Sequence, residues 1–234
     1  MASGHGLVFL EKLAGAGTNE TLASAVLVGG LITAAGLAAN AALKKKENPI
    51  VPDSRLSLVN FFELMVGFLI SLGDNVMGKE NRKYLPFVGT IFIYILFSNL
   101  LGLIPGFSMP TDSILFNLGI ALVVFVLYNY WGIREVGAVA YFKHLLGPIW
   151  WIAPLLLVIE IISHIVRPIS LSLRLFGNMT GDHIVLAVFT DLTKYVFPVI
   201  FYGLGTFVCL MQAFVFTLLT MIYIRFAVAH DEDH

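Results

Sequence analysis

Charged residues are scarce in this sequence, and their scarcity points to the class of protein. Of its 234 residues, 12% are charged and 58% are hydrophobic, and the mean hydropathy is +0.88. Soluble domains of similar length carry about twice that share of charged residues, so the composition indicates a membrane protein. The net charge is −1 and no basic stretch is interleaved with aromatic residues, so the sequence gives no sign of nucleic-acid binding.

Patterns that bind metals, cofactors or nucleotides are also lacking. The single cysteine, Cys209, lies in an apolar run and cannot form an internal disulfide, which favours a small packing residue. No cysteine and histidine cluster has metal-ligand spacing, and neither a P-loop nor a Gly-x-Ser-x-Gly motif occurs. We therefore predict no metal, no cofactor and no catalysis by this chain alone.

Long apolar runs are what the sequence has in abundance, and a helix needs about 20 apolar residues to cross a bilayer. We predict an all-α membrane protein, a single integral membrane domain over residues 1–234. It has five crossing helices, a surface helix and an N-terminal external segment. The predicted segments are external 1–20, crossings 21–43, 84–105, 113–133, 148–190 and 195–225, and surface helix 55–77.

Two of these segments have alternative interpretations. The run 21–43 could be a secretory signal, but Lys44, Lys45 and Lys46 follow at once and would resist translocation, which favours a retained helix. The segment 55–77 contains Glu63 and Asp74 among apolar residues. A helix lying along the membrane surface explains that mixture better than a crossing does.

The last two apolar segments are too long to cross a bilayer upright. As straight helices, 43 residues would be about 64 Å long and 30 residues about 45 Å, against a bilayer of about 30 Å. Either the first is a re-entrant hairpin, or both helices are strongly tilted. Tilt is the more economical interpretation, because it explains both lengths.

The basic residues predict the orientation, because cytoplasmic loops carry an excess of lysine and arginine. With the N-terminus outside and the C-terminus cytoplasmic, five crossings leave only Lys12 and Lys194 outside. Nothing resembles an organelle transit peptide, so we predict a multi-pass protein of a bacterial inner (plasma) membrane. Ten of the 14 basic residues are then cytoplasmic: Lys44, Lys45, Lys46, Arg55, Lys79, Arg82, Lys83, Arg134, Lys143 and Arg225.

Most polar residues within 148–190 share one face of the predicted helix. His183 is the exception, because it lies about 180° round the helix axis from Arg174. Glu160 and His164 can pair along the helix, and Arg167 can reach the headgroups, so a structural role for these three stays open. At about 100° per residue with Arg174 as zero, the face holds Ser170 near −40°, Arg167 near +20°, Glu160 and Asn178 near +40°, and His164 and Asp182 near +80°.

Arg174 is the polar residue whose presence is hardest to explain by structure alone. An arginine at bilayer depth costs about 2.5–3.5 kcal/mol on insertion scales. No acidic residue lies three or four positions away on either side, and Asp182 is two turns further on. We therefore expect a carboxylate partner from another subunit.

At these residues the sequence resembles subunit a of the rotary F-type ATP synthases. The block Ser170-Leu-Ser-Leu-Arg174-Leu-Phe-Gly-Asn178-Met is similar to the signature of that family. Glu160 precedes the arginine by fourteen residues, as in the family. Gln212-Ala-Phe-Val-Phe resembles its Gln-Ala-Phe motif, and Pro110-Thr-Asp112 resembles the turn before its third crossing. The likeness covers most of the chain beyond residue 20.

The resemblance implies a stator subunit beside a rotating ring of c subunits, each with a carboxylate at mid-membrane. Two aqueous half-channels would reach that carboxylate, one from each side. Arg174 would face the ring between them, attract each carboxylate in its ionised form and block ion leakage. The implied partners are the c-ring, the subunit b peripheral stalk, the remaining ATP synthase subunits and the lipid bilayer.

Carried over by position, Asn178, His183 and Gln212 would line the outer half-channel. His183 departs from family members that have glutamate there, opposite a histidine on the last helix at the position of Gly205. A histidine titrates near neutral pH and can still relay protons. Asp182 adds a second titratable group beside it, which the resemblance does not place.

Four further residues are candidates for lining the channel. Glu160 and Ser170 would belong to the cytoplasmic half-channel. Asp112 and Asn117 would lie at the outer entrance, although Asp112 fits a helix N-cap equally well. The sequence leaves open whether protons or sodium ions flow.

Two other functions compete with this one. A self-contained ion-coupled transporter would need broken helices and internal symmetry, and the sequence shows neither. If the chain were only a structural anchor of a membrane complex, the free-energy cost of inserting Arg174 into the membrane would be unexplained.

Overall fold

The computed structural model describes residues 20–44, 58–104, 107, 109–137, 141, 153–192 and 196–228. The predicted external segment 1–20 lies outside them except for its last residue, as do residues 148–152 of the fourth predicted crossing. The described part contains helices and no strand: α2 (Glu20–Lys44), α3 (Leu58–Val76), η1 (Lys79–Tyr84), α4 (Leu85–Leu101), η2 (Pro110–Asp112), α5 (Ile114–Val136), α7 (Ala153–Leu192) and α8 (Val196–Val228).

All six α-helices of the described part have the length and apolar composition that a membrane crossing requires. The predicted all-α membrane fold is therefore confirmed, and six such helices agree roughly with five crossings plus one surface helix. The helix α3 is itself long and apolar enough to cross. Its assignment to the membrane surface and the predicted segment boundaries stay predictions.

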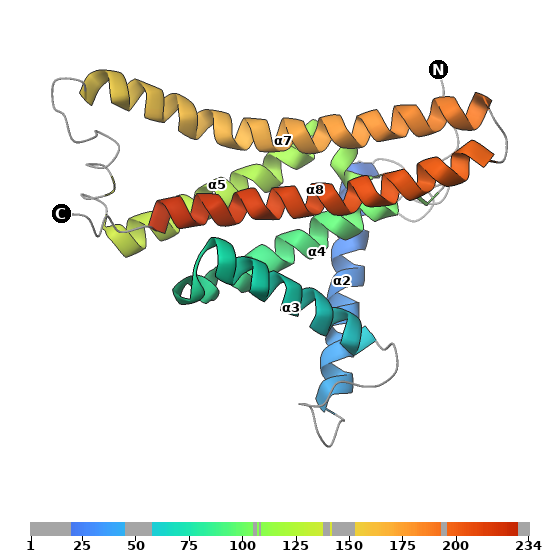
Figure 1. The fold of residues 1–234 in the computed structure, drawn as a ribbon, viewed down its shortest axis with the longest axis horizontal. Helices are drawn as coiled ribbons and strands as arrows, with labels where there is room; N and C mark the ends of the chain where they lie inside the picture. Colours follow the sequence, from blue (N-terminus) through green and yellow to red (C-terminus); the bar gives the residue numbers. More distant parts are fainter. Residues whose placement is uncertain are drawn as a thin grey trace.

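The two C-terminal helices are the longest elements and lie side by side in opposite directions (Figure 1). With 40 and 33 residues, α7 and α8 are about 60 and 50 Å long, which exceeds the bilayer thickness of about 30 Å. In Figure 1 they run across the direction of α2. Because α7 is one continuous helix, the re-entrant hairpin does not hold, and strong tilt remains.

A proline lies inside α7 without ending it. Pro168 cannot donate a backbone hydrogen bond and would end an exposed helix in water. Membrane helices tolerate proline because neighbouring helices and polar side chains satisfy the freed groups. Here Pro168 is buried on the side of α7 that packs on α5 and α8, so the packing holds the helix together at this point.

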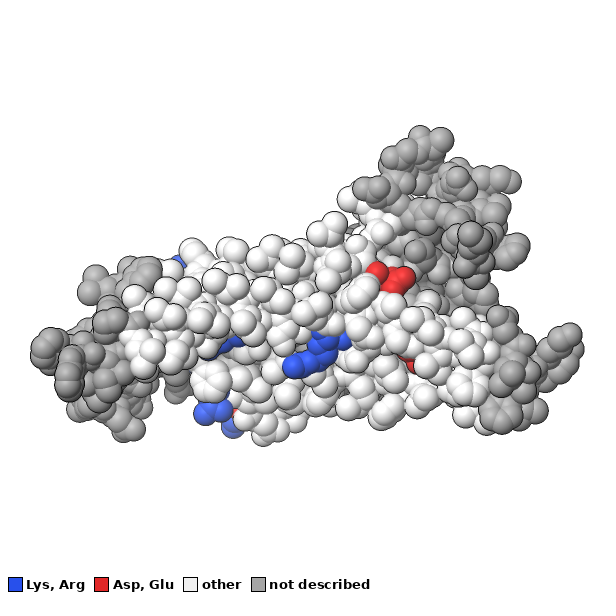
Figure 2. Space-filling model, turned by 90° about the horizontal axis from the view of Figure 1, so that it is seen from above, with Lys and Arg blue, Asp and Glu red and all other residues white. Residues whose placement is uncertain are grey.

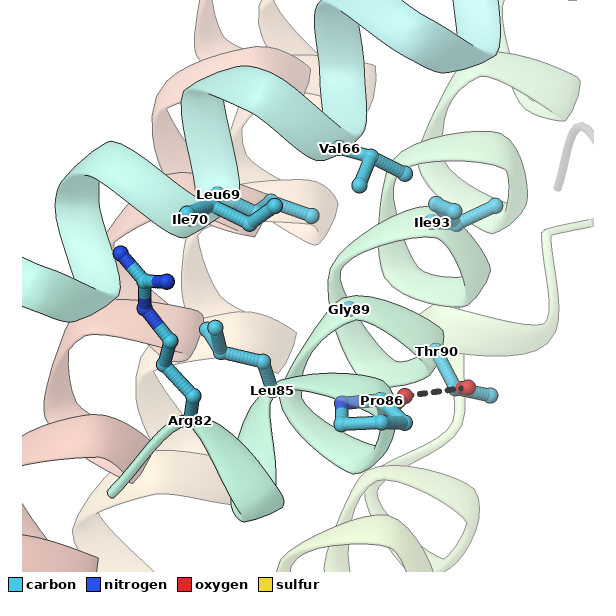
Figure 3. Close-up of a pocket in the computed structure, with 9 residues that line it drawn as sticks. All are labelled: Val66, Leu69, Ile70, Arg82, Leu85, Pro86, Gly89, Thr90 and Ile93. Carbon is cyan, nitrogen blue, oxygen red and sulfur yellow. Dashed lines mark hydrogen bonds between the residues drawn. The ribbon is translucent and has the colours of Figure 1, made fainter. Parts of the chain in front are cut away.

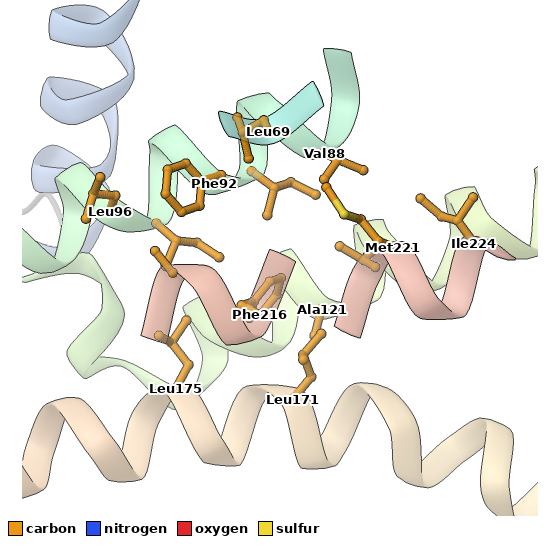
Figure 4. Packing of buried hydrophobic residues seen from close by; sticks show 14 of the residues in the cluster. Leu69, Val88, Phe92, Leu96, Ala121, Leu171, Leu175, Phe216, Met221 and Ile224 are labelled. Carbon is orange, nitrogen blue, oxygen red and sulfur yellow. The ribbon is translucent and has the colours of Figure 1, made fainter. Parts of the chain in front are cut away.

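Close packing among α3, α4, α5, α7 and α8 holds the long hairpin to the rest of the chain. Leu171 and Leu175 of α7 point toward Phe216 of α8 and Ala121 of α5 (Figure 4). Leu175 and Phe216 are fully buried. Since lipid tails are as apolar as leucine, these helices associate through van der Waals packing more than through the hydrophobic effect.

Charged groups gather where α3, α4, α5 and α8 meet at one end of the fold. Arg82 donates from Nε and Nη2 to the two carboxylate oxygens of Asp74 at 2.8 and 2.5 Å. Lys83 donates to Glu135 at 2.5 Å, which joins the start of α4 to the end of α5. Arg225 donates to the last carbonyl of α3 at 2.8 Å. This end therefore faces a polar environment.

Two neighbouring valines of α5 provide a test of the packing. Val124 is 1% exposed and belongs to the core, whereas Val123 is 54% exposed. We expect Val124→Ala to destabilise the protein by about 1–3 kcal/mol, because it leaves a cavity among packed side chains. Val123→Ala should change stability by less than about 0.5 kcal/mol. Thermal unfolding midpoints of the detergent-solubilised protein measure the difference. Equal midpoints for the two variants would contradict this packing.

Candidate functional site

Arg174 lies near the middle of α7 and is exposed, while Leu171 and Leu175 on either side of it are buried. Its side chain therefore lies on the exposed part of α7, beside the face that packs on α5 and α8. It makes no hydrogen bond or ion pair with any residue that the structure describes. The expectation that this arginine has no carboxylate partner on its own helix agrees with this geometry.

The side chains around this arginine on α7 are uncharged. In the view from above, most of the surface is uncharged, and basic and acidic atoms form a few separate small patches (Figure 2). Within one turn of it on the same face lie Ser170, Gly177 and Asn178, none of which is charged. A guanidinium on such a surface needs an anionic partner that approaches from outside the chain.

The N-terminal half of α7 carries a cluster of polar side chains. The Glu160 carboxylate lies 3.3 Å from Nδ1 of His164 and 3.6 Å from Nη2 of Arg167. The Arg167 guanidinium also lies over the ring of Tyr223 on α8, 5.5 Å from its centre. The structure thus pairs Glu160 with both basic neighbours, and the pairing interpretation of these residues holds for the chain by itself.

This cluster extends beyond α7. The Tyr141 hydroxyl donates to Oδ1 of Asn129 at 2.7 Å and lies 3.4 Å from Nε2 of His164. Sequence reasoning missed Tyr141 and Asn129, because single polar residues near the end of a span have no distinctive pattern. Ser170, the other candidate on this side, is half-buried.

On the other side of Arg174, two predicted channel residues are joined. Asn178 Nδ2 donates to Oε1 of Gln212 at 2.6 Å, which links α7 to α8. Gln212 is 4% exposed, and its own Nε2 is buried without a partner in the described part of the chain. The two residues lie 34 positions apart in the sequence, so only the fold brings them together.

Two more predicted residues, Asp112 and Asn117, lie in the turn before α5 and in the first turn of α5. Thr180 of α7 donates to Oδ1 of Asp112 at 2.9 Å. Asp112 makes no side-chain cap to α5, so the N-cap interpretation of this residue does not hold. Asn117 is fully buried and donates from Nδ2 to the carbonyl of Thr111 at 2.7 Å.

Asp182, which the resemblance did not place, lies against α8. A Cβ atom added at Gly205 would stand 2.7 Å from Oδ2 of Asp182 and 3.0 Å from Leu103. The carboxylate therefore occupies the space that a side chain at position 205 would fill. His183 is half-buried, and its Nε2 has no hydrogen-bond partner within the described residues.

Buried polar side chains on α4 were missed by sequence reasoning. Ser98 and Asn99 are fully buried, and their side-chain polar atoms have no partner in the part of the chain that is described. A buried amide without partners costs about 1–3 kcal/mol, so such groups usually hold ordered water. The signal in the sequence was two consecutive polar residues inside a predicted crossing.

Known proteins resemble this chain over most of its length. A family model described as "ATP synthase A chain" matches residues 22–225, which include every candidate site residue. The chain belongs to the ATP synthase A chain family. The match covers most of the chain, so the family assignment applies to the six membrane helices together.

Individual relatives agree with this assignment. An ATP synthase subunit a of Bdellovibrio bacteriovorus is 50% identical over 196 residues, which cover 84% of this chain and 86% of that protein. One of Helicobacter hepaticus is 48% identical, over 75% of this chain and 78% of that protein. One of Sulfurimonas denitrificans is 47% identical, over 74% of this chain and 78% of that protein. As a member of the ATP synthase A chain family, the chain is a multi-pass membrane subunit of an ATP synthase, which couples proton transport to ATP synthesis.

The bond between Asn178 and Gln212 can be tested by a double-mutant cycle. Each single substitution to alanine breaks the bond, so the double variant should lose less stability than the sum of the singles, by about 1 kcal/mol. Thermal midpoints of the solubilised complex measure the coupling. Thr206→Ala, which affects a bond within α8 only, serves as the control and should add to Gln212→Ala without coupling. Additive effects of Asn178→Ala and Gln212→Ala would contradict the bond.

The contact between Asp182 and Gly205 gives a second prediction for this family member. Gly205→Ala forces a methyl group against the carboxylate, and such overpacking costs about 1–3 kcal/mol. We expect lower stability and slower ATP-driven proton pumping by the whole complex. Gly203→Ala, whose added Cβ meets nothing within 4 Å, should behave as wild type. Equal pumping by the two variants would show that Asp182 lies elsewhere.

Proposed function

We propose that this chain is the ion-translocating stator subunit of a rotary ATP synthase, with Arg174 as the charge that faces the rotor. The observation that carries the proposal is the exposed guanidinium near the middle of α7, which has no partner among the described residues and no acidic residue within one turn. The chain alone performs no catalysis. It supplies the path by which protons reach and leave the carboxylates of the c-ring.

Attraction between Arg174 and a rotor carboxylate has a workable magnitude. At 4 Å and an effective dielectric constant of about 20, the pair gains about 4 kcal/mol before desolvation, enough to favour the ionised carboxylate about a thousandfold. One proton that crosses a membrane potential of 100 mV releases about 2.3 kcal/mol. A single proton therefore cannot separate an Arg174–carboxylate pair that is much more stable than this. Several protons per ATP follow from this balance.

Polar side chains lie on both sides of Arg174 along α7, which supports two separate half-channels. Asn178, Asp182 and His183 lie on the C-terminal side of Arg174, and Glu160 lies on its N-terminal side. We assign the C-terminal group, together with Gln212, Asp112 and Asn117, to the half-channel from outside. Glu160 and Ser170 belong to the half-channel that opens to the cytoplasm. Arg174 separates the two, so a proton must board the rotor to pass.

The orientation follows from the charges at the helix ends. Lys44, Lys79, Arg82, Lys83 and Arg225 lie at the ends of their helices, where the positive-inside rule places the cytoplasm. We propose a bacterial inner membrane with the N-terminus outside and the C-terminus cytoplasmic. The c-ring then lies against the exposed face of α7, and subunit b of the peripheral stalk contacts another part of the chain.

The proposal is tested by ATP-driven proton pumping in vesicles that carry the whole complex. Arg174→Ala should assemble, lose coupled pumping and let protons leak through the membrane sector, because nothing then separates the two half-channels. Arg134→Ala removes an exposed arginine at the end of α5 and should pump as wild type. If assembled Arg174→Ala complexes pump normally, the chain is a structural anchor and the proposed mechanism is wrong.

A further inference from the structure

An apolar hollow of about 440 Å³ lies between α3 and α4, among residues that the proposed ion path does not use. Figure 3 shows side chains of α3 on one side of it and side chains of α4 on the other. Val66, Ile70, Pro86 and Thr90 are exposed, so the hollow opens at the surface of the protein. Its lining consists of Val66, Leu69, Ile70, Arg82, Leu85, Pro86, Gly89, Thr90 and Ile93.

Water is a poor occupant of this hollow. Thr90 is the only uncharged polar side chain in the lining, and its hydroxyl already donates to the carbonyl of Pro86 at 2.8 Å. Apolar cavities without polar partners stay dry. The volume has room for about a dozen water-sized groups, which suits a row of methylene groups. In a membrane protein the apolar molecule at hand is a lipid tail.

A basic side chain stands at one end of the hollow. The Arg82 side chain is 53% exposed, and Figure 3 shows it beside Leu85 at the edge of the lining. Two of its five N–H groups bind Asp74, which leaves three for another acceptor. Lys79 of η1 is also exposed and makes no hydrogen bond or ion pair with the described residues. Guanidinium groups bind phosphate oxygens in a paired geometry.

We propose that the hollow between α3 and α4 binds an anionic glycerophospholipid. One acyl chain fills the hollow, and the phosphate accepts hydrogen bonds from Arg82, with Lys79 as a second positive charge. Both the charge and the shape of the hollow suit this lipid. The apolar lining opens toward the hydrocarbon of the bilayer, and the basic side chains lie at the end of the helices, at the level of the lipid headgroups. The bound lipid joins α3 to α4 and leaves the exposed face of α7 free.

Photo-crosslinking tests the proposal in the purified, delipidated whole complex. The probe is phosphatidylglycerol with a diazirine in its acyl chain, and phosphatidylcholine with the same label is the comparison. We expect crosslinks to residues 66–93, about threefold more from phosphatidylglycerol, the size expected for one exposed charge pair. This comparison uses the wild-type complex only. Equal labelling by both lipids, or none of these residues labelled, would overturn the proposal.

Two variants locate the lipid. Gly89→Leu fills the hollow, because a Cβ at Gly89 meets only Leu69 at 3.5 Å, and should abolish the crosslinks. Gly119→Leu, where a Cβ meets nothing within 4 Å, is the matched control and should leave them unchanged. Arg82→Gln should remove the preference for phosphatidylglycerol while labelling persists. Undiminished labelling of an assembled Gly89→Leu complex, or a helix of another subunit crosslinked into the hollow, would contradict a bound lipid.

Discussion

One unpaired positive charge determines how the rest of the structure can be understood. Arg174 lies near the middle of α7 among uncharged neighbours, and it pairs with no carboxylate of the described residues. By contrast, Arg82 and Arg167 each lie beside a carboxylate. A charge kept at bilayer depth without an internal partner is expensive, so its partner must come from outside. The packing of α7 on α5 and α8 determines where this charge lies.

The long hairpin explains how the charge is presented. Tilt lets α7 display many residues to a neighbour along one face, while Leu171 and Leu175 pack the adjacent face against α5 and α8. The polar contacts follow the same division. The bond from Asn178 to Gln212 and the contact of Asp182 with Gly205 lie on one side of the arginine, and the group around Glu160 lies on the other. A rigid, packed scaffold thus carries two polar regions separated by one cation.

The sequence alone predicted the fold class well and the contacts poorly. Helical membrane segments are local features, set by runs of apolar residues and by their length, and strong tilt followed from segments longer than a bilayer. Contacts between helices depend on rotation and register, which no run of residues reveals. The neighbour of Asp182 and the burial of Asn99 therefore emerged only from the structure, as did the link from Tyr141 to His164. The motif around Arg174 was recognisable because its residues are consecutive on one helix.

The most direct test of the central claim is a cryo-EM structure of the whole complex at a resolution that shows side chains. The account predicts that the guanidinium of Arg174 faces the c-ring and lies within about 4–6 Å of a rotor carboxylate, the range in which opposite charges favour ionisation. It also predicts that no acidic residue of the stator is closer. An Arg174 that pairs with a stator carboxylate, or that faces lipid away from the ring, would contradict the account.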